Sequence, residues 1–531
     1  MHHSLAFCLP PRTIGAFMSA ELSRVFSAAL YGVDALEVEI EVNETTSEEM
    51  QAMTVIVGLP DAAVRESRDR VWTAIANSAY PINPGGRTTV NLAPANLKKE
   101  GPSFDLPIAV AMIANRVDYA DRRQLDNYCI VGELALNGLV RPVKGILSIA
   151  LSARASGRAE VLVPLENAEE ASVVDGVKVI GVRNLREAFE HVTGRAPLLP
   201  QKRKSLEDFA GTQSWEIDFA DVKGQQSVKR ALEVAVAGGH NILMVGPPGT
   251  GKSMLAKRIP TIMPAMTEAE AIETTRIHSV CGLLNSRHQF VVHRPFRSPH
   301  HTISDAGLLG GGSNPLPGEV STAHNGVLFL DELPEFHRST LEVLRQPLED
   351  GKVTISRASG SMTFPSRCML VGAMNPCACG YFGDLKRECR CGTAQVVRYR
   401  QRISGPLLDR IDIHVEVPLV EYRELAKSES GEHSSAIRAR IEAARAIQQR
   451  RARTTNATLS PKQMKEYCRI DEESSMLLEN TMSQMNFSAR AHDRILRVAR
   501  TIADLAGAQN ISADHLLEAI GYRTLDRNLL G

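Results

Sequence analysis

The chain has 531 residues, which is enough for roughly two to four domains of ordinary size. Its 61 lysine and arginine residues balance its 61 aspartate and glutamate residues, which excludes a polycation that coats nucleic acid through bulk charge but not a local basic channel. Hydrophobic residues make up 43% of the chain, as in soluble folded proteins, and no apolar run reaches the roughly 18 residues that a membrane span needs.

Residues 1–19 show no pattern of a folded element, and Met18 competes with Met1 as the start because patterned sequence begins just after it. The apolar stretch Leu5–Leu9 is too short for a signal peptide and lacks a basic leader. The 9 cysteines are not spaced like the disulfide framework of a secreted protein. We therefore expect a cytoplasmic protein whose first residues are unstructured or misassigned.

Residues 20–194 alternate between strand-like and helix-like patterns, which predicts a mixed α/β domain. Asp61 has the side chain of a helix N-cap, and the amphipathic stretch after it places Val64, Val71, Trp72 and Ile75 on one face. Runs rich in β-branched residues predict strands at Leu36–Val42, Met53–Val57, Thr88–Leu92, Cys129–Val131, Val161–Val163 and Val177–Ile180.

Residues 195–214 lose this periodicity and contain Pro197, Pro200 and the basic triplet Lys202-Arg203-Lys204, which predicts a linker. A second α/β pattern covers residues 215–425. Residues 426–531 show apolar side chains at helical spacing, so we expect a C-terminal helical domain there.

A glycine-rich loop stands between the apolar strand expected at Ile242–Val245 and a helix that can begin at Ser253. Glycines let backbone N–H groups turn inward around phosphates, and the start of the following helix adds positive potential. In such a phosphate loop Lys252 would reach the β- and γ-phosphates of ATP, and Ser253 would bind Mg²⁺. The alternative is a strand-to-helix turn without a ligand. The loop consists of Gly246, Pro247, Pro248, Gly249, Thr250, Gly251, Lys252 and Ser253.

Two carboxylates follow the apolar strand expected at Val327–Leu330. Folds with buried parallel strands bind their ligands at the carboxyl ends of those strands. Asp331 is therefore a candidate for holding Mg²⁺, and Glu332 for polarising the attacking water as a general base. The alternative is that both carboxylates cap the next helix.

Basic side chains in the second half of the chain are candidates for contacts with nucleic acid. Lys352–Ile355 and Ser361–Phe364 have the pattern of a hairpin that turns at Ala358-Ser359-Gly360. This hairpin carries Lys352 and Arg357, for which a solvated surface is the alternative. Because only 5% of the residues are aromatic, we expect sequence-independent, salt-sensitive phosphate contacts rather than an extended base-stacking surface. Further candidates are Arg398, Arg400, Arg402, Arg450, Arg451 and Arg453.

A third apolar strand is expected at Met369–Met374, and the amide of Asn375 directly after it could orient the attacking water. A simple turn residue is the alternative. A C-x-C pair then stands at each end of residues 377–391, a spacing that can close a structural tetrahedral zinc site. The alternatives are two disulfides or four free thiols. The zinc ligands would be Cys377, Cys379, Cys389 and Cys391.

Arg410 follows a Gly-Pro break and stands between Asp409 and Asp412. It could reach the γ-phosphate of a neighbouring subunit as an arginine finger. An ion pair with Asp409 or Asp412 of the same chain is the alternative, and the spacing does not decide between the two.

The phosphate loop, the Asp-Glu strand, the Asn strand and the arginine, in this order, resemble the nucleotide site of an AAA+ ATPase. The segment Arg294–Thr302, with Gly307–Gly312 after it, resembles the helix-2 insertion of the magnesium-chelatase branch. The chain is identified more narrowly as a member of the Mg-chelatase-like ComM (YifB) family of bacteria. That resemblance covers nearly the whole chain from about residue 20 and rests also on Val57-Gly58-Leu59-Pro60, Asn91–Ala95, Asn375-Pro376-Cys377 and Ser404–Val417.

The resemblance implies an α/β fold with a Lon-protease-like N-terminal domain, an AAA+ core whose parallel sheet is flanked by helices, and an all-α lid. It makes Asn375 the sensor 1 residue, Arg410 the finger and Arg490 the sensor 2 arginine of the lid. It further implies ATP and Mg²⁺ as ligands, a homo-hexameric ring, and helicase or branch-migration activity on single-stranded or branched DNA.

The Lon-like part raises a second function. Lys99-Glu100-Gly101-Pro102-Ser103 resembles the segment that carries Lon's nucleophilic serine. A serine nucleophile needs a neighbouring base, and the resemblance puts Leu147 where Lon has its lysine, with Lys144 one helical turn earlier. We therefore expect Ser103 to be an ordinary hydroxyl, and the domain to have a structural or partner-binding role.

The expected function is an ATP-hydrolysing ring motor that acts on DNA. The alternatives are a motor that remodels a protein partner, as the ATPase subunit of magnesium chelatase does, and an ATP-dependent protease.

Overall fold

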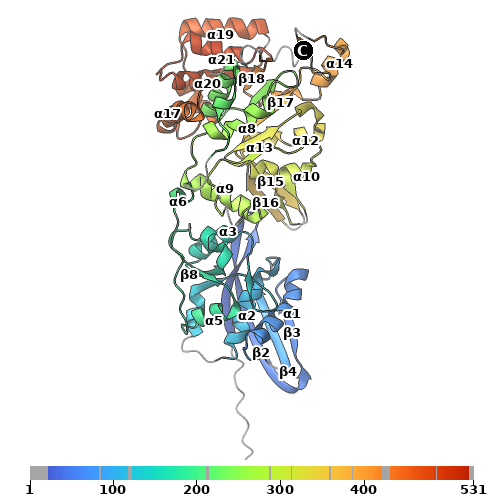
Figure 1. The fold of residues 1–531 in the computed structure, drawn as a ribbon, viewed down its shortest axis with the longest axis vertical. Helices are drawn as coiled ribbons and strands as arrows, with labels where there is room; N and C mark the ends of the chain where they lie inside the picture. The colour runs from blue at the N-terminus through green and yellow to red at the C-terminus, as the bar shows by residue number, and fades with distance from the viewer. Residues whose placement is uncertain are drawn as a thin grey trace, which may run out of the picture. The chain divides into compact units, whose positions relative to one another are not determined.

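The computed structural model describes residues 22–82, 85–117, 122–210, 215–285, 289–312, 314–357, 360–384, 387–420, 431–485 and 487–525. The chain divides into two compact units, the first up to Arg203 and the second from Lys204 onward, with Tyr31–Asp34 grouped with the second. Figure 1 colours the first unit blue to teal and the second green to red. The expectation for residues 1–19 and the turn residues Ala358 and Ser359 lie outside the described residues.

The first unit is built on a mixed sheet with the strand order β3-β4-β2-β1-β5-β8-β9. Strands β2 and β4 are antiparallel, whereas β3 pairs with β4, and β5 with both β1 and β8, in parallel. All strands expected from β-branched runs are present, which confirms the α/β prediction. The strands are β1 (Ser23–Tyr31), β2 (Asp34–Gln51), β3 (Met53–Val57), β4 (Gly85–Ala93), β5 (Tyr128–Ile130), β8 (Glu160–Pro164) and β9 (Lys178–Val182), with a separate ribbon of β6 (Glu133–Leu134) and β7 (Val140–Arg141).

The helices of the first unit follow from local sequence. The Asp61 carboxylate accepts a hydrogen bond from the Val64 N–H at 2.8 Å, so it caps α1 (Ala62–Asn77) as predicted. The apolar run of α2 (Asp105–Ala114) is buried on all sides, which explains why it shows no amphipathic face. The other helices of this unit are α3 (Ile146–Ala155), α4 (Ala168–Ala171) and α5 (Leu185–Val192).

The second unit contains a parallel sheet with the order β11-β14-β17-β10-β18, which confirms the predicted parallel sheet. Side chains along β10, β14 and β17 alternate between two hydrophobic cores: in β10, Ile242 and Met244 enter one, and Leu243 and Val245 the other. Both faces of the sheet are therefore covered, which explains its nearly continuous apolar strands. The strands are β11 (Phe296–Arg297), β14 (Val327–Leu330), β17 (Met369–Met374), β10 (Ile242–Val245) and β18 (Ile413–Glu416).

Helices cover both faces of this sheet, and the second unit also contains two short ribbons (Figure 1). The helices before the C-terminal region are α6 (Leu206–Ala210), α7 (Gln226–Gly238), α8 (Lys252–Ile262), α9 (Glu268–Cys281), α10 (Asp305–Leu309), α11 (Glu319–Thr322), α12 (Arg338–Glu342), α13 (Arg345–Asp350), α14 (Thr393–Arg400) and α15 (Gly405–Leu408). The ribbons are β12 (Gly310–Gly311) with β13 (Leu316–Pro317), and the expected hairpin β15 (Lys352–Arg357) with β16 (Gly360–Pro365). The segment predicted as a linker thus contains the short helix α6, which is too brief to show a periodic apolar face.

The C-terminal region is helical, as predicted, and shares a core with one face of the sheet. Ile441 and Ala444 of α17 and Ile495 and Ile502 of α20 are buried in the same cluster as Ile242. The helices are α17 (Ser434–Ala452), α18 (Pro461–Tyr467), α19 (Glu472–Met485), α20 (Ala489–Leu505) and α21 (Ala513–Gly521). We refer to them as the lid.

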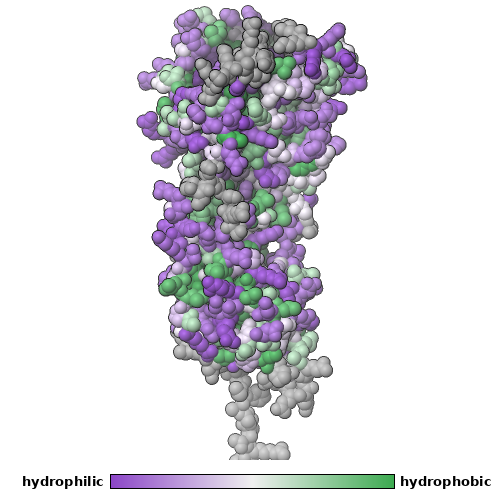
Figure 2. Space-filling model, viewed as in Figure 1, coloured by the Kyte–Doolittle hydropathy of each residue, from purple (hydrophilic) through white to green (hydrophobic). Residues whose placement is uncertain are grey.

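The surface matches this distribution of side chains. On the face shown in Figure 2, hydrophilic residues cover most of the surface of both units. Among the helices of the described ranges, none combines the length and the apolar character that are needed to cross a bilayer.

Candidate functional site

The glycine-rich loop connects β10 to α8, which begins at Lys252. Gly249 and Gly251 have φ angles of 82° and 85°, a region that glycine enters without strain. A Cβ atom on Gly246 would lie 2.3 Å from the carbonyl oxygen of Val417, so only glycine fits there. The backbone thus has the curled path and the helix N-terminus that a phosphate-binding loop requires.

Lys252 is held within this loop. Its ammonium donates hydrogen bonds to the carbonyls of Gly246 at 2.7 Å and Pro247 at 2.9 Å, and to the Asn375 side-chain oxygen at 3.2 Å. Burial lowers the pKa of Lys252, and the charges of Asp331 and Glu332 act in the opposite direction. The amine is therefore oriented along the loop, next to the carboxylates at the end of β14.

Oxygen ligands for a divalent cation lie directly beside the lysine. The Ser253 hydroxyl donates to the Asp331 carboxylate at 2.5 Å, and the other carboxylate oxygen accepts from the Glu332 N–H at 2.9 Å. A hydroxyl and a carboxylate are the hard oxygen ligands that Mg²⁺ takes beside nucleotide phosphates. The residues present therefore fit the Mg²⁺ that accompanies ATP.

Glu332 stands at the exposed end of the same strand. Its φ of 51° lies in the left-handed region, which is uncommon for a residue other than glycine and costs on the order of 1–3 kcal/mol. The side chain is 60% exposed, and one carboxylate oxygen lies 3.6 Å from Nδ1 of His301. The strained backbone points this acid outward, where a water molecule can reach it.

His301 was not among the site residues predicted from the sequence. It belongs to the segment Arg294–Thr302, and its ring lies against that of His300 with centroids 4.1 Å apart. The sequence signal was present, since two adjacent histidines in that segment offer ring nitrogens for polar contacts. Only the fold brings His301 to Glu332.

Asn375 occupies the end of β17, which lies between β10 and β14 in the sheet. Val245 pairs with Met374, so Asn375 follows at the level of Gly246. The structure therefore brings Lys252, Ser253, Asp331, Glu332 and Asn375 together at the carboxyl edge of the sheet.

Arg410 makes its polar contacts away from this cluster. Its guanidinium forms an ion pair with Glu349 of α13 and donates to the carbonyls of Arg345 at 3.1 Å and Pro406 at 2.9 Å. The intrachain partner is thus Glu349 rather than Asp409 or Asp412. Arg410 and Glu349 line a surface groove of about 430 Å³.

Arg490, the candidate sensor of the lid, lies in the first turn of α20. Its side chain is 64% exposed, and its guanidinium lies 3.9 Å from the carboxylate of Asp409. The described contacts connect Arg490 with the segment that carries Arg410, and not with the phosphate loop.

The cysteines of residues 377–391 come together. The sulfur of Cys377 lies 3.4 Å from that of Cys379 and 3.7 Å from that of Cys389, and Cys379 and Cys389 are 3.5 Å apart. With Cys391, all four sulfur atoms lie within 4.8 Å of one another. Tetrahedral zinc with Zn–S bonds of about 2.3 Å would separate its sulfurs by about 3.8 Å. The cluster therefore has the dimensions of a four-thiolate zinc site.

The cysteine loop also contacts the phosphate loop. Gly380 has a φ of 88°, and a Cβ atom on it would lie 2.6 Å from Cδ of Pro248. The shape of the cysteine loop is therefore coupled to the backbone that surrounds Lys252.

The basic candidates fall into two groups. Lys352 and Arg357 on the hairpin are exposed, and so is Arg398, which lines a groove of about 510 Å³ together with Arg338 and Arg402. A second group has intramolecular partners. Arg402 belongs to it, because it forms an ion pair with Glu335 of the same groove at 2.7 Å. Arg400 donates to the Pro376 carbonyl at 3.0 Å, and Arg451 binds the Asp504 carboxylate at 2.7 Å. Arg450 and Arg453, at the end of α17, are exposed.

Ser103 lies in the first unit, where its carbonyl accepts a hydrogen bond from the Gly132 N–H at 3.0 Å. Leu147 is fully buried in α3, Lys144 is exposed, and the buried Lys99 donates to the Pro94 carbonyl. Burial lowers the pKa of Lys99. The described contacts give the Ser103 hydroxyl no basic partner.

Comparison with known proteins gives consistent matches along the chain. Models of magnesium chelatase subunit ChlI match residues 40–167 and 218–425, and the model of its C-terminal part matches residues 431–523. The chain is 43% identical to competence protein ComM of Haemophilus influenzae over 512 residues, which cover 96% of this chain and 98% of that protein. It is 42% identical to YifB of Escherichia coli over 510 residues, with the same coverage of 96% and 98%. Lon protease 2 of Bacillus subtilis is 29% identical over 106 residues, which cover 20% of this chain and 18% of that protein.

Proposed function

Because the chain belongs to the Mg-chelatase-like family of ComM and YifB, which has AAA+ domains, we propose that it hydrolyses ATP and uses the energy to move DNA. The observation that carries this proposal is the convergence of the phosphate-loop lysine with two strand-end carboxylates and an amide. A protein that only binds nucleotide needs no second acid beside the cation ligand.

The side chains divide the work of hydrolysis. Lys252 would place a positive charge against the β- and γ-phosphates, and Ser253 and Asp331 would hold Mg²⁺, which when bound would supply neutralising charge for the phosphate oxygens. Glu332 accepts a proton from the attacking water, and Asn375 orients that water from the neighbouring strand. Phosphoryl transfer depends mainly on positioning and electrostatic stabilisation, which these fixed groups supply.

The ATP site is completed by a second copy of the chain. The described contacts of Arg410 are with Glu349 and Arg345 of α13, and not with the cluster around Lys252. This placement supports a role for Arg410 at the ATP site of an adjoining copy. A ring of six copies would give every site one such arginine. Hydrolysis at each boundary would then change the angle between neighbouring copies.

The proposed substrate of the motor is DNA. The exposed hairpin residues Lys352 and Arg357, and the groove residues Arg338 and Arg398, offer positive charge to backbone phosphates, while Arg402 in the same groove is paired with Glu335. Such contacts would be independent of sequence and suited to helicase or branch-migration activity on single-stranded or branched DNA.

The test is the rate of ATP hydrolysis by the full chain, with and without single-stranded, forked and duplex DNA. We expect forked or single-stranded DNA to stimulate hydrolysis, and the stimulation to fall steeply between about 50 and 200 mM salt. A rate that none of these DNAs changes would contradict action on DNA.

The second candidate is a motor that remodels a protein, which the matches to magnesium chelatase subunit ChlI favour. Its partner would bind the N-terminal unit. In that case DNA would leave the rate unchanged, whereas a protein bound by the N-terminal unit would raise it.

We also propose that Cys377, Cys379, Cys389 and Cys391 bind a structural Zn²⁺. No disulfide joins any cysteine of the described residues, so the four sulfur atoms are available as metal ligands. Four thiolates leave no open position for water, so the metal would shape the loop that Gly380 packs against Pro248.

A further inference from the structure

Two aspartates flank Arg410, and both contact the same lid helix. Asp409 lies 3.9 Å from the guanidinium of Arg490, and Asp412 forms an ion pair with Arg494. Arg490 and Arg494 are one turn apart on α20, so they project from the same side of the helix. The segment that presents Arg410 is therefore bound to the lid before and after the arginine.

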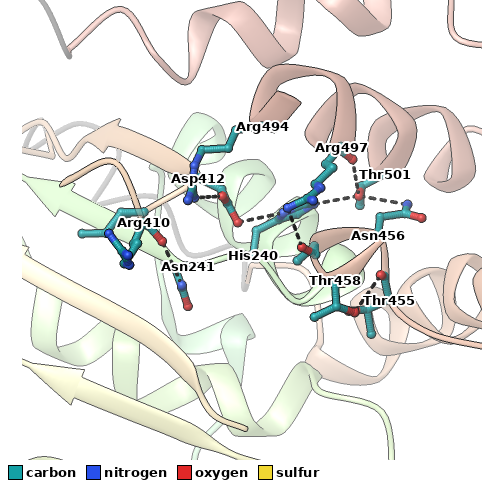
Figure 3. A network of polar contacts seen from close by, with 12 residues as sticks. His240, Asn241, Arg410, Asp412, Thr455, Asn456, Thr458, Arg494, Arg497 and Thr501 are labelled. Atoms are coloured by element: carbon teal, nitrogen blue, oxygen red, sulfur yellow. Dashed lines mark hydrogen bonds and ion pairs between the residues drawn. The ribbon is translucent and has the colours of Figure 1, made fainter. Parts of the chain in front are cut away.

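The second of these connections is buried and double. One carboxylate oxygen of Asp412 accepts from Arg494, and the other lies 3.1 Å from Nδ1 of His240. The Nε2 atom of the fully buried His240 lies 2.8 Å from the hydroxyl of Thr501, two turns after Arg494 on α20. Figure 3 shows Asp412 between Arg494 and His240, with Thr501 on the far side of the imidazole ring. Helix α20 thus reaches Asp412 directly and through His240.

The backbone of the same segment is fixed to the sheet. The Asn241 carbonyl accepts from the N–H groups of Asp412 at 3.0 Å and Ile413 at 3.1 Å, and the Asn241 side-chain amide donates to the Arg410 carbonyl at 3.0 Å (Figure 3). The Asn241 side-chain oxygen in turn accepts from the Leu370 N–H at 2.8 Å. Arg410 is therefore attached to the sheet by its main chain and to the lid by its neighbours.

Asp412 is charged in this environment. Burial alone acts to raise its pKa, but the charge of Arg494 and the hydrogen bond from His240 outweigh burial and hold the pKa below its ordinary value. An ionised carboxylate only accepts hydrogen bonds, so Nδ1 of His240 carries the proton in this contact.

The two ion pairs differ in strength. Side chains of the Arg494–Asp412 pair are 17% and 8% exposed, whereas those of the Arg490–Asp409 pair are 64% and 27% exposed. Breaking a buried pair leaves an uncompensated charge, while a long, exposed pair contributes little. A lid movement can therefore release Asp409 and still carry Asp412 along.

We propose that Arg494 and His240 are positioning residues that make the Arg410 segment follow lid helix α20 through Asp412. Lid movement at one ATP site would then set the position of the arginine that the same copy presents to the next site. This inference rests on the proposed ring ATPase, in which Arg410 acts between copies.

The experiment measures the steady-state ATPase activity of the full chain carrying Arg494→Gln. We expect kcat to fall about tenfold while the KM for ATP changes less than about twofold, because the phosphate loop is intact and only the presented arginine is misplaced. Arg494→Lys, which retains the positive charge, should recover part of kcat. In the Arg410→Ala background, Arg494→Gln should cause no further loss, since both changes remove the same contribution.

Arg497→Gln is the matched control. Arg497 lies on the same helix but donates to the carbonyls of Ala457 at 3.1 Å and Leu459 at 2.8 Å, within the lid. If general loosening of the lid were the cause, Arg497→Gln would lower kcat as much as Arg494→Gln. We expect its kcat to stay within about twofold of the unchanged protein.

A second variant covers the case in which Arg494→Gln fails to fold, as judged by loss of fluorescent-nucleotide binding. His240→Gln keeps the Arg494–Asp412 pair and removes the connection to Thr501, and should lower kcat about threefold at unchanged KM. If the loss of kcat caused by either variant added to that of Arg410→Ala, or if either variant raised KM at normal kcat, the inference would be overturned. The proposed function would not be affected by these results. If Arg410→Ala by itself left kcat unchanged, both this inference and the proposed site shared between copies would be contradicted.

Discussion

The proposed ATP site of the second unit and the Ser103 region of the first unit both resemble catalytic machinery of known enzymes, but they differ in what surrounds the key residue. Lys252 donates a hydrogen bond to the amide of Asn375, which follows β17. It also interacts electrostatically with Asp331 and Glu332, which follow β14. Ser103 has a hydrogen-bonded backbone, and the position expected to carry a base is the buried Leu147. A motif thus supports chemistry only where the fold brings complementary groups to it.

Lys252→Ala should have the most general effect, because it removes nucleotide binding, on which hydrolysis depends. The variant should lose nucleotide affinity by at least about 100-fold, because a buried, charge-assisted contact to phosphate disappears. Titration with a fluorescent ATP analogue measures this. The exposed Lys257 on the same helix is the control, and Lys257→Ala should bind normally. Unchanged nucleotide affinity in Lys252→Ala would contradict the assignment of the Lys252 cluster as a nucleotide site.

Glu332→Gln should bind ATP with nearly unchanged affinity and hydrolyse it about 10²–10⁴ times more slowly, because the amide cannot accept the proton of the attacking water. Single-turnover hydrolysis together with nucleotide titration separates the two effects. Glu335→Gln changes an exposed acid on the following turn and should keep the basal rate within about twofold. Near-normal turnover by Glu332→Gln would contradict its role as the base.

Removal of the metal should have an intermediate effect. The purified chain should contain about one zinc per copy by elemental analysis, and Cys379→Ser should lose it and reduce the ATPase rate about tenfold through the contact of Gly380 with Pro248. Cys281→Ser, at a cysteine outside the cluster, should change neither value. A full ATPase rate in the zinc-free protein would contradict the claim that the shape of the cysteine loop affects ATP hydrolysis.

Ser103→Ala should have the smallest effect. We expect no casein cleavage above background by the unchanged protein, and an ATPase rate within about twofold in the variant, because the hydroxyl has no base to activate it. Proteolysis that is abolished by Ser103→Ala would reverse the comparison and restore the protease alternative.

The parts of the fold that were predictable have local causes. Asp61 caps α1 through the N–H of Val64, three residues further along the chain. Val327–Leu330 is apolar throughout because a central parallel strand is buried on both faces. Strand β1 was not among the strands predicted, since Ser23–Tyr31 contains serines and alanines in place of a β-branched run. The order of apolar strands and polar residues along the chain was likewise enough to nominate Asp331 and Asn375.

The remaining features depend on contacts between distant parts of the chain. Glu349 and Arg410 are 61 residues apart, and His240 and Asp412 are 172 apart, so no local pattern connects them. His301 reaches Glu332 because Phe296 and Arg297, earlier in the same segment, pair with β14 as the edge strand β11. The partners that position the arginine therefore became visible only in the structure.

The central claim is that ATP is cleaved at a site shared by two copies of the chain. The most direct measurement mixes Arg410→Ala and Glu332→Gln proteins, each nearly inactive alone, over a range of ratios. We expect activity to reappear and to peak at intermediate ratios, because an intact Glu332 in one copy then meets an intact Arg410 from its neighbour. No recovery at any ratio, with both variants shown to assemble together, would contradict the claim.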